Sequence, residues 1–309
     1  MQYSAAVFGL GNIGRCCVEA LEIMPDCHCA GVVRRASSLG KDMRDLRGVP
    51  VFSSLDELAA QAGMPDVCLV AAPSRQAPDQ AANLLERGLC SVDSFDVHDQ
   101  IPAVLNRLDT VAKQGRAVAV IAAGWDPGSD SVLRALFEAM VPVGASFTNF
   151  GRGRSMGHSA AVRAMSGVED AVAITIPQGG GRHARLVYVV LKPGVDLAVV
   201  TATIKADPYF AHDPLDVRAV TQAELPFVAD NSHGVLLERT GASGLTANQR
   251  LSFDMRIDNQ ALTAQMMVSC ARAAVRLKKQ GHFGAYTMID LPPVMLLPGE
   301  RMDNVKRLV

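Results

Sequence analysis

The stretch Ala5-Ala6-Val7-Phe8-Gly9-Leu10-Gly11-Asn12-Ile13-Gly14-Arg15 decides the fold of this chain. An apolar run typical of a β-strand leads directly into Gly9-x-Gly11-x-x-Gly14, and residues 16–23 then have the pattern of a helix. In such a unit the first glycine permits a tight turn, the second lets backbone approach a pyrophosphate, and the third lets the helix pack on the strand. The free N–H groups and positive dipole end of the helix then favour phosphate. We therefore predict a dinucleotide-binding turn, the alternative being a merely structural strand–turn–helix unit.

The second predicted strand indicates which dinucleotide binds. This strand, at residues 30–33, is short and apolar. Arg34-Arg35 follow it directly, at the place where a site for NAD usually carries an acidic residue. A carboxylate there would bind the ribose 2′-hydroxyl group and repel a 2′-phosphate, whereas guanidinium groups can pair with that phosphate. We therefore predict NADP(H) as the cofactor. An exposed basic turn is the alternative interpretation.

Predicted strands and helices alternate over the first 123 residues, which indicates a doubly wound parallel sheet. The apolar run 66–72 ends at Pro73-Ser74, and the loops after such strands line the cofactor crevice of open α/β sheets. The predicted cofactor-binding residues are Gly9, Gly11, Asn12, Ile13, Gly14, Arg34, Arg35, Ala72, Pro73 and Ser74.

The pattern changes after about residue 145. Runs of β type at 147–150, 171–176, 184–191 and 195–204 are separated by polar or glycine-rich pieces, and a long amphipathic helix follows at 262–279. We predict a Rossmann domain over residues 1–123 and a second, α+β domain for substrate binding and dimerisation over 124–259. The segment 260–309 is expected to pack back on the first domain.

Composition and charge narrow the class of protein. A length of 309 residues suits about two domains. Apolar residues make up 49% of the chain and charged residues 20%, as in an ordinary globular protein, and a net charge of −1 gives no general attraction to nucleic acid or an anionic membrane. We see no apolar run of about 18 residues and no leader of signal type, so we expect a cytoplasmic protein. The seven cysteines lack the spacing of a metal site, and no metal is predicted.

Two carboxylates stand out as candidates for chemistry. Asp96 and Asp126 both follow strands of the predicted Rossmann sheet, so both should face the nicotinamide crevice. They suit a cationic substrate group, such as a protonated amine whose carbon is about to lose hydride, and one could deprotonate that amine or an attacking water. Turn formation or helix capping is the alternative for each, especially for Asp126 before Pro127.

The second predicted domain offers groups for an anionic end of a substrate. Arg182, His183 and Arg185 lie at the start of a strand, and arginine pairs well with carboxylates. The alternative for these three residues is a solvated strand edge. The glycine-spaced loop 151–159 would wrap an anion or simply connect elements. His233 would bind a carboxylate or be a satisfied loop histidine, and Asn259 would contact substrate or cap the long helix. Together these residues suggest a zwitterionic, amino-acid-like substrate.

Several motifs together resemble one known family. Gly9-x-Gly11-x-x-Gly14, Val92-Asp93-Ser94-Phe95-Asp96-Val97-His98, Gly124-Trp125-Asp126-Pro127-Gly128 and Asn149-Phe150-Gly151-x-Gly153-x-Ser155-Met156-Gly157-His158-Ser159 occur in that order. The chain resembles the meso-diaminopimelate D-dehydrogenases nearly end to end. The short turn at 178–181 is similar to that of the compact subgroup, in which broader activity on D-amino acids occurs.

The resemblance implies an NADP-dependent, reversible oxidative deamination in lysine biosynthesis. Meso-2,6-diaminopimelate would be oxidised at its D-centre to L-2-amino-6-oxopimelate and ammonia, by a homodimer built through the second domain. It assigns the reacting amino group to Asp96 and Asp126. It places Trp125, Phe150, Met156 and Gly157 around that group, with Thr175, Arg185 and His233 on the distal carboxylate and Asn259 also on the substrate.

Two other interpretations stay open, and a third is disfavoured. Another NADP-linked reductase of lysine-type metabolism would share the cofactor turn but would not use ammonia as a co-substrate. A catalytically silent NADP-binding sensor would not require paired aspartates beside the crevice. A thiohemiacetal mechanism at Cys90 is disfavoured, because that thiol lies within an apolar strand.

Overall fold

The computed structural model describes residues 2–39, 46, 48–150, 153–180, 182–208, 210–228 and 233–309. The chain forms two compact units, one comprising Met1–Ala135 with Gln260–Val309 and the other Leu136–Asn259. Trp125 and Asp126 therefore belong to the first unit. The functions predicted for the two units, cofactor binding and substrate binding with dimerisation, stay predictions.

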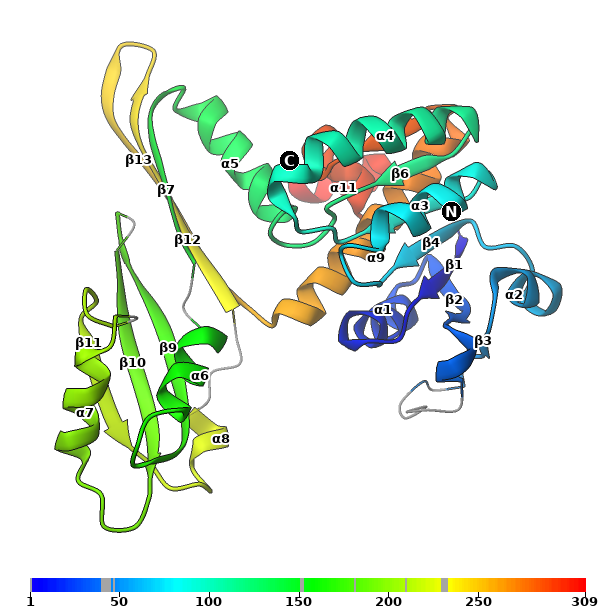
Figure 1. Ribbon diagram of the computed structural model, residues 1–309. Helices are drawn as coiled ribbons and strands as arrows, with labels where there is room; N and C mark the ends of the chain where they lie inside the picture. The colour runs from blue at the N-terminus through cyan, green and yellow to red at the C-terminus, as the bar shows by residue number, and fades with distance from the viewer. Residues whose placement is uncertain are drawn as a thin grey trace. The chain divides into compact units, whose positions relative to one another are not determined.

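The first unit is built on a seven-stranded sheet in the order β14-β6-β5-β4-β1-β2-β3, and every pair of neighbouring strands is parallel. This is the predicted doubly wound Rossmann sheet, and helices lie on both of its faces (Figure 1). The strands are β1 (Tyr3–Phe8), β2 (Cys27–Val33), β3 (Val51–Phe52), β4 (Val67–Val70), β5 (Cys90–Asp93), β6 (Val118–Val120) and β14 (Gly284–Tyr286). The larger helices are α1 (Asn12–Ile23), α2 (Leu55–Ala62), α3 (Ala77–Glu86), α4 (Ile101–Gln114), α5 (Ser129–Met140), α9 (Asn259–Lys279) and α11 (Arg301–Leu308), with the short α10 (Pro293–Leu296) before α11.

Alternating side chains of the strands build a core on each face of this sheet. In β1, Ala5 and Val7 join one hydrophobic cluster and Ala6 joins another, because successive residues of a strand point to opposite faces. The first cluster contains buried residues of α1 and α9, and the second contains Leu55 and Leu58 of α2. Strand β14, which the sequence analysis missed, pairs with β6 and extends the sheet by one strand.

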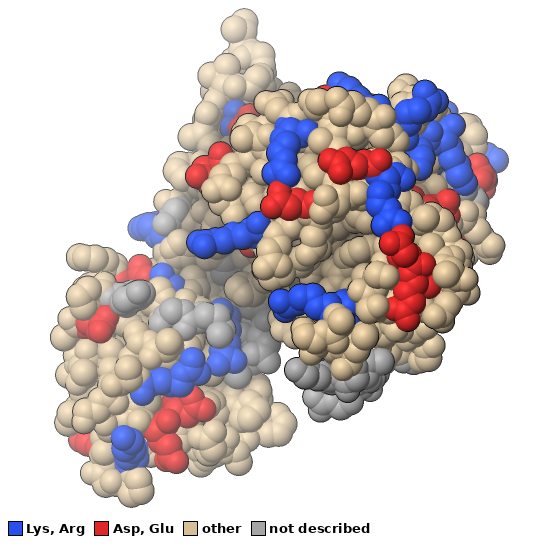
Figure 2. Space-filling view, turned by 45° about the vertical axis from the view of Figure 1, so that its right-hand side comes forward, with Lys and Arg blue, Asp and Glu red and all other residues tan. Residues whose placement is uncertain are grey.

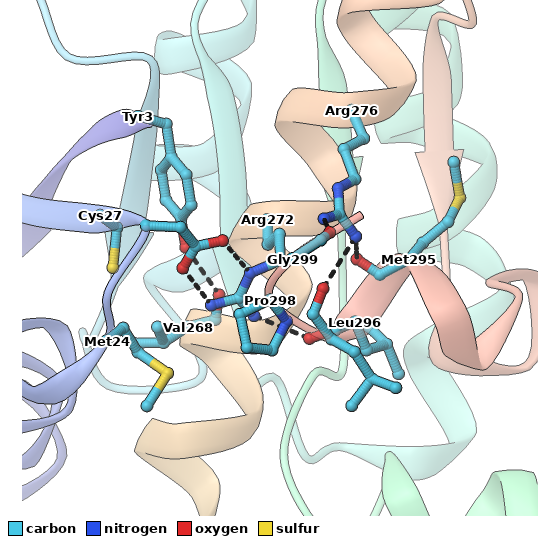
Figure 3. Close-up of polar contacts among 12 residues, drawn as sticks. Tyr3, Met24, Cys27, Val268, Arg272, Arg276, Met295, Leu296, Pro298 and Gly299 are labelled. Carbon is cyan, nitrogen blue, oxygen red and sulfur yellow. Dashed lines mark hydrogen bonds and ion pairs between the residues drawn. The ribbon is translucent and has the colours of Figure 1, made fainter. Parts of the chain in front are cut away.

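Two side chains of α9 hold the C-terminal segment (Figure 3). The guanidinium group of Arg272 is fully buried and bidentate to Asp26, with N–O distances of 2.6 and 2.7 Å, and it also donates to the carbonyl group of Leu296. Arg276 donates to the carbonyl groups of Val294, Met295, Leu297 and Gly299. Helix α9 thus fixes the turn between α10 and α11, whose carbonyl groups would otherwise lack these partners.

The second unit contains two sheets, and Figure 1 shows their strands in green and yellow. One is mixed, in the order β11-β10-β9-β8, and the other is antiparallel, in the order β13-β12-β7. The strands are β7 (Val143–Phe150), β8 (Gly153–Ser155), β9 (Val168–Gly179), β10 (Arg182–Leu191), β11 (Leu215–Ala219), β12 (His233–Ser243) and β13 (Thr246–Ile257). The helices are α6 (Met156–Arg163), α7 (Leu197–Ala206) and α8 (Leu225–Val228).

One predicted strand is wrong. The β-branched run at 195–204 forms helix α7, because the carboxylate of Asp196 caps the helix by accepting a hydrogen bond from the backbone of Ala198 at 2.9 Å. Val200 and Ile204 lie four residues apart and are buried against the mixed sheet, whereas Val199 is exposed. Packing of one helical face therefore outweighs the strand propensity of valine and threonine.

Candidate active site

The turn between β1 and α1 has the geometry that its glycines predict. Gly9 has a φ of +99°, and a Cβ atom there would lie 2.6 Å from the carbonyl oxygen of Ala71. A Cβ atom on Gly14 would lie 2.2 Å from the carbonyl oxygen of Gly9, so helix and strand pack too closely for any side chain. At Gly11 the added Cβ would meet nothing among the described residues within 4 Å. This open space beside the start of α1, where Asn12 and Ile13 begin the helix, fits a pyrophosphate.

The two arginines after β2 lie next to this turn in the sheet. The backbone N–H of Gly9 donates to the carbonyl of Val33 at 2.9 Å, and that of Arg34 donates to Phe52 at 3.0 Å. Arg34 is half-buried and Arg35 is exposed. The position of these two arginines at the end of β2 fits recognition of a group on the nucleotide ribose.

Residues after β4 connect the cofactor side to a candidate catalytic carboxylate. Ala72 and Pro73 lead to Ser74, whose hydroxyl group donates to Oδ1 of Asp96 at 2.6 Å. Ser74 follows β4 and Asp96 follows β5, and these strands are neighbours in the sheet. The sequence analysis placed both residues at this edge, but it did not foresee the bond between them.

Asp93 joins the two loops that carry the candidate aspartates. Its Oδ1 atom accepts hydrogen bonds from the backbone of Phe95 at 3.0 Å and of Ala122 at 3.3 Å. Its own carbonyl group accepts from Ala123 at 2.8 Å. Asp93 therefore anchors two loops: the one after β5 that carries Asp96, and the one after β6 that leads to Trp125 and Asp126.

Burial sets the protonation of Asp93. The side chain is almost wholly buried, and Oδ2 accepts no hydrogen bond within the described part of the chain. Desolvation raises the pKa of Asp93 to about 6, although the bonds from Phe95 and Ala122 act to lower it. A carboxyl group of this kind is neutral well above the usual range of an aspartic acid.

Asp126 lies beside two charged residues of α5 that the sequence analysis missed. Nη2 of Arg134 is 2.7 Å from Oδ2 of Asp130 and 3.7 Å from Oδ1 of Asp126. Trp125, the preceding residue, is buried. A spacing of four residues puts Asp130 and Arg134 on one helix face, and this was the signal available in the sequence.

In the second unit, Thr175 and Arg185 are directly opposite each other on β9 and β10. The guanidinium group of Arg185 donates to the hydroxyl oxygen of Thr175 and, through Nε, to Oδ2 of Asp213 at 2.7 Å. Asp213 was not predicted. It orients a half-buried arginine whose planar fork suits a carboxylate.

Three more candidates meet at one end of the β13-β12-β7 sheet. Phe150 ends β7, His233 begins β12 and is paired with Ile257 of β13, and Asn259 begins α9. Met156 and Gly157 begin α6, directly after the short strand β8, which pairs with β9 beside Thr175. Gly151 and Arg152 of the predicted anion-binding loop lie outside the described residues.

Over the described ranges, no group of three or more His, Cys, Asp or Glu side chains has an arrangement that could hold a metal ion. Nor does any helix in those ranges combine the length and apolar character needed to cross a membrane. Acidic and basic side chains are interspersed over the face shown in Figure 2, as the net charge of −1 suggests.

Comparisons with known proteins agree with this geometry. Residues 3–92 match the family model of the oxidoreductases with an NAD-binding Rossmann fold, and residues 124–181 match the diaminopimelic acid dehydrogenase C-terminal domain. The meso-diaminopimelate D-dehydrogenase of Bacteroides fragilis is 44% identical over 99% of this chain and 98% of its own. The crystal structure of C. glutamicum DAP dehydrogenase in complex with DAP has a TM-score of 0.73 and 28% identity, covering 100% of this chain and 99% of its own. An engineered D-amino acid dehydrogenase bound to NADP⁺ has a TM-score of 0.71 and 27% identity, with 100% of both chains covered.

The sheet order, the glycine turn and the aspartates beyond the strand ends define a nucleotide-binding Rossmann oxidoreductase. Within that class, the chain belongs to the meso-diaminopimelate D-dehydrogenase family.

Proposed function

We propose that this chain catalyses the NADP-dependent, reversible oxidative deamination of meso-2,6-diaminopimelate at its D-centre, giving L-2-amino-6-oxopimelate and ammonia. The observation that carries the proposal is the pair of loops after β5 and β6, which place Asp96 and Asp126 beyond adjacent strands and are joined through Asp93. The names of the relatives support the choice of substrate.

The proposed cofactor contacts follow from the turn geometry. Gly9, Gly11 and Gly14, with Asn12 and Ile13, would hold the pyrophosphate, and Arg34 with Arg35 would pair with a 2′-phosphate. Ala72, Pro73 and Ser74 would line the crevice beyond β4. When bound, the nicotinamide ring accepts hydride from the substrate. The structure of a relative with NADP⁺ bound supports this choice.

Asp96 and Asp126 would bind the reacting ammonium group. One N–H bond of that group breaks, its electron pair stays on nitrogen, and a carboxylate oxygen takes the proton. After the α-carbon has lost hydride, water adds to the resulting imine and ammonia leaves, which makes the ketone. Buried Trp125 would exclude bulk water from one side.

The distal L-centre would be held by the second unit. Thr175, Arg185 and His233 would bind its carboxylate, and Asn259 would also contact the substrate. Phe150, Met156 and Gly157 would complete the pocket around the reacting amino group at the D-centre. Because Asp213 already fixes Nε of Arg185, little rotational freedom of that side chain is lost on binding. Fixing the far carboxylate and the near amine orients the D-centre for transfer, and an L-centre in its place would point its hydrogen away.

The test measures formation of the reduced cofactor by its absorbance, using purified protein. The substrates are meso-diaminopimelate, its L,L isomer and D-alanine, each tried with NADP⁺ and with NAD⁺. We expect turnover of the meso isomer with NADP⁺ and none of the L,L isomer. Activity on D-alanine would extend the function to other D-amino acids. Cofactor binding without any turnover would contradict the proposal and favour a silent sensor, and failure of ammonia to support the reverse reaction would favour a reductase of another type.

A further inference from the structure

Asp130 is an unusual acidic residue for the first turn of a helix. Such residues are ordinarily exposed and interact with the helix dipole. Asp130 is fully buried, and its backbone N–H donates to the carbonyl group of Trp125 at 3.0 Å, so it is held against the turn that carries Asp126. Its Oδ1 atom accepts a hydrogen bond from Ser131 at 3.3 Å.

The second oxygen of Asp130 lies close to the same guanidinium group as Asp126. Oδ2 of Asp130 and Oδ1 of Asp126 are both buried, and neither accepts a hydrogen bond from any residue that the structure describes. Both contact the same guanidinium nitrogen, Nη2 of Arg134, at 2.7 and 3.7 Å. The side chain of Asp126 retains 13% of its exposure, so only this member of the pair reaches a substrate.

Two carboxyl groups held together in this way bind protons as a pair. Burial, and after it the neighbouring carboxyl group of Asp126, raises the pKa of Asp130 to about 7, while Arg134 and Ser131 act in the opposite direction. Asp126 and Arg134 are the charged groups that act on Asp130 within the described residues. A single positive charge thus faces two carboxyl groups, and it does not neutralise both.

We propose that Asp130 is a positioning residue: together with Arg134 it holds Asp126 in a buried carboxyl pair, and this pair, not a lone carboxylate, accepts the proton of the substrate. This inference rests on the proposed function, in which Asp126 contacts the substrate ammonium group. When an N–H bond of that group breaks, the proton goes to the pair, whose summed charge changes from −2 to −1. A lone carboxylate with an ordinary pKa of about 4 accepts a proton from an ammonium group far less readily.

The test compares the pH profile of kcat/KM for oxidation of meso-diaminopimelate in the wild type and in Asp130→Asn, an uncharged side chain of the same size. We expect the acidic limb of the wild-type profile to move to lower pH by about one unit or more in the variant, and kcat on the plateau to fall roughly tenfold. Asp79→Asn is the matched control, because Asp79 is also in the first turn of a helix and pairs with an arginine, but it is exposed. It should leave the profile unchanged.

An unchanged acidic limb in folded Asp130→Asn protein would overturn the inference while the proposed function stands. A wild type that does not oxidise the meso isomer at all would overturn both. Should the variant not fold, ¹³C NMR of the aspartate carboxyl carbons of the wild type gives a second measurement. A carboxyl group that titrates well above the ordinary range both in the wild type and in Asp93→Asn, and so is not Asp93, supports the pair, and its absence overturns it.

Discussion

Asp93 holds in place the two loops that carry the candidate catalytic residues Asp96 and Asp126. One oxygen of its carboxyl group accepts hydrogen bonds from the N–H groups of Phe95 and Ala122, one in each aspartate-bearing loop, while burial raises its pKa to about 6, above the ordinary 3.8. Because folding favours the protonated form, the stabilisation from neutral Asp93 is fully present below about pH 4. It is lost as the pH rises through 6, where the folded state must bury a charge.

Asp93→Asn should therefore change how stability depends on pH. The amide oxygen can accept the same two N–H groups, but it does not ionise. The free energy of unfolding of the wild type relative to the variant should fall by roughly 2 kcal/mol between pH 4 and pH 7. Urea denaturation at several pH values measures this difference. A difference that is constant across this range would show that Asp93 does not titrate there.

Arg185→Ala tests the distal carboxylate site. Losing a charge-assisted hydrogen bond costs about 1.5–3 kcal/mol, so KM for meso-diaminopimelate should rise roughly tenfold to a hundredfold. KM for D-alanine, which lacks the distal group, should change little. Arg182→Ala is the control, since Arg182 is exposed at the start of the same strand. Equal effects of Arg185→Ala on both substrates would contradict the assignment.

The sequence could predict Asp96 and Asp126 as neighbours, because the carboxyl ends of adjacent parallel strands meet at one edge of the sheet. It could not predict the roles of Asp93, Asp130 and Asp213. Each depends on burial or on a partner distant in sequence, and no periodic pattern encodes either. Whether the predicted residues bind substrate stays a prediction.

At the scale of elements, helix α9 was the most predictable part of the C-terminal region and also the most consequential. Its long apolar pattern is visible in the sequence, and its buried residues complete the core on one face of the Rossmann sheet. Strand β14 was missed because three residues give no usable pattern. The hairpin of β12 and β13 was missed, although the sequence contains two signs of it. Apolar and polar residues alternate over Leu251-Ser-Phe-Asp-Met-Arg-Ile257, and Gly244 marks a turn before them.

The attachment of α9 to the sheet depends on the pair of Arg272 with Asp26. Arg272→Met should lower the free energy of unfolding by about 3–5 kcal/mol, since it leaves a buried carboxylate without its partner. Adding Asp26→Asn should restore part of that loss. Arg107→Ala, which removes an exposed ion pair with Asp79, should have little effect. Chemical denaturation checks all three, and equal losses for Arg272→Met and Arg107→Ala would show that burial of the pair is unimportant.

At the scale of the whole molecule, the second unit is an insertion within the first, because the chain returns to complete the Rossmann sheet after residue 259. Its β13-β12-β7 sheet has one face of unusual character. Along the edge strand β13, Leu251, Phe253, Met255 and Ile257 point to one face and are only half-buried, while the alternate residues are polar and exposed. A row of apolar side chains that one chain covers incompletely is typical of a surface that binds another copy.

We therefore predict that the chain forms a homodimer through this face and that Phe253→Asp weakens the dimer. The aspartate would place a charge in the centre of the apolar row, and an unpaired charge buried at an interface is costly. Light scattering should give the mass of two chains for the wild type and of one chain for the variant at low concentration. Ser252→Asp adds the same charge to the opposite face of the same strand, so it should leave the dimer intact. Circular dichroism of each variant establishes that the fold is kept. A folded Phe253→Asp protein with the mass of two chains would place the interface elsewhere.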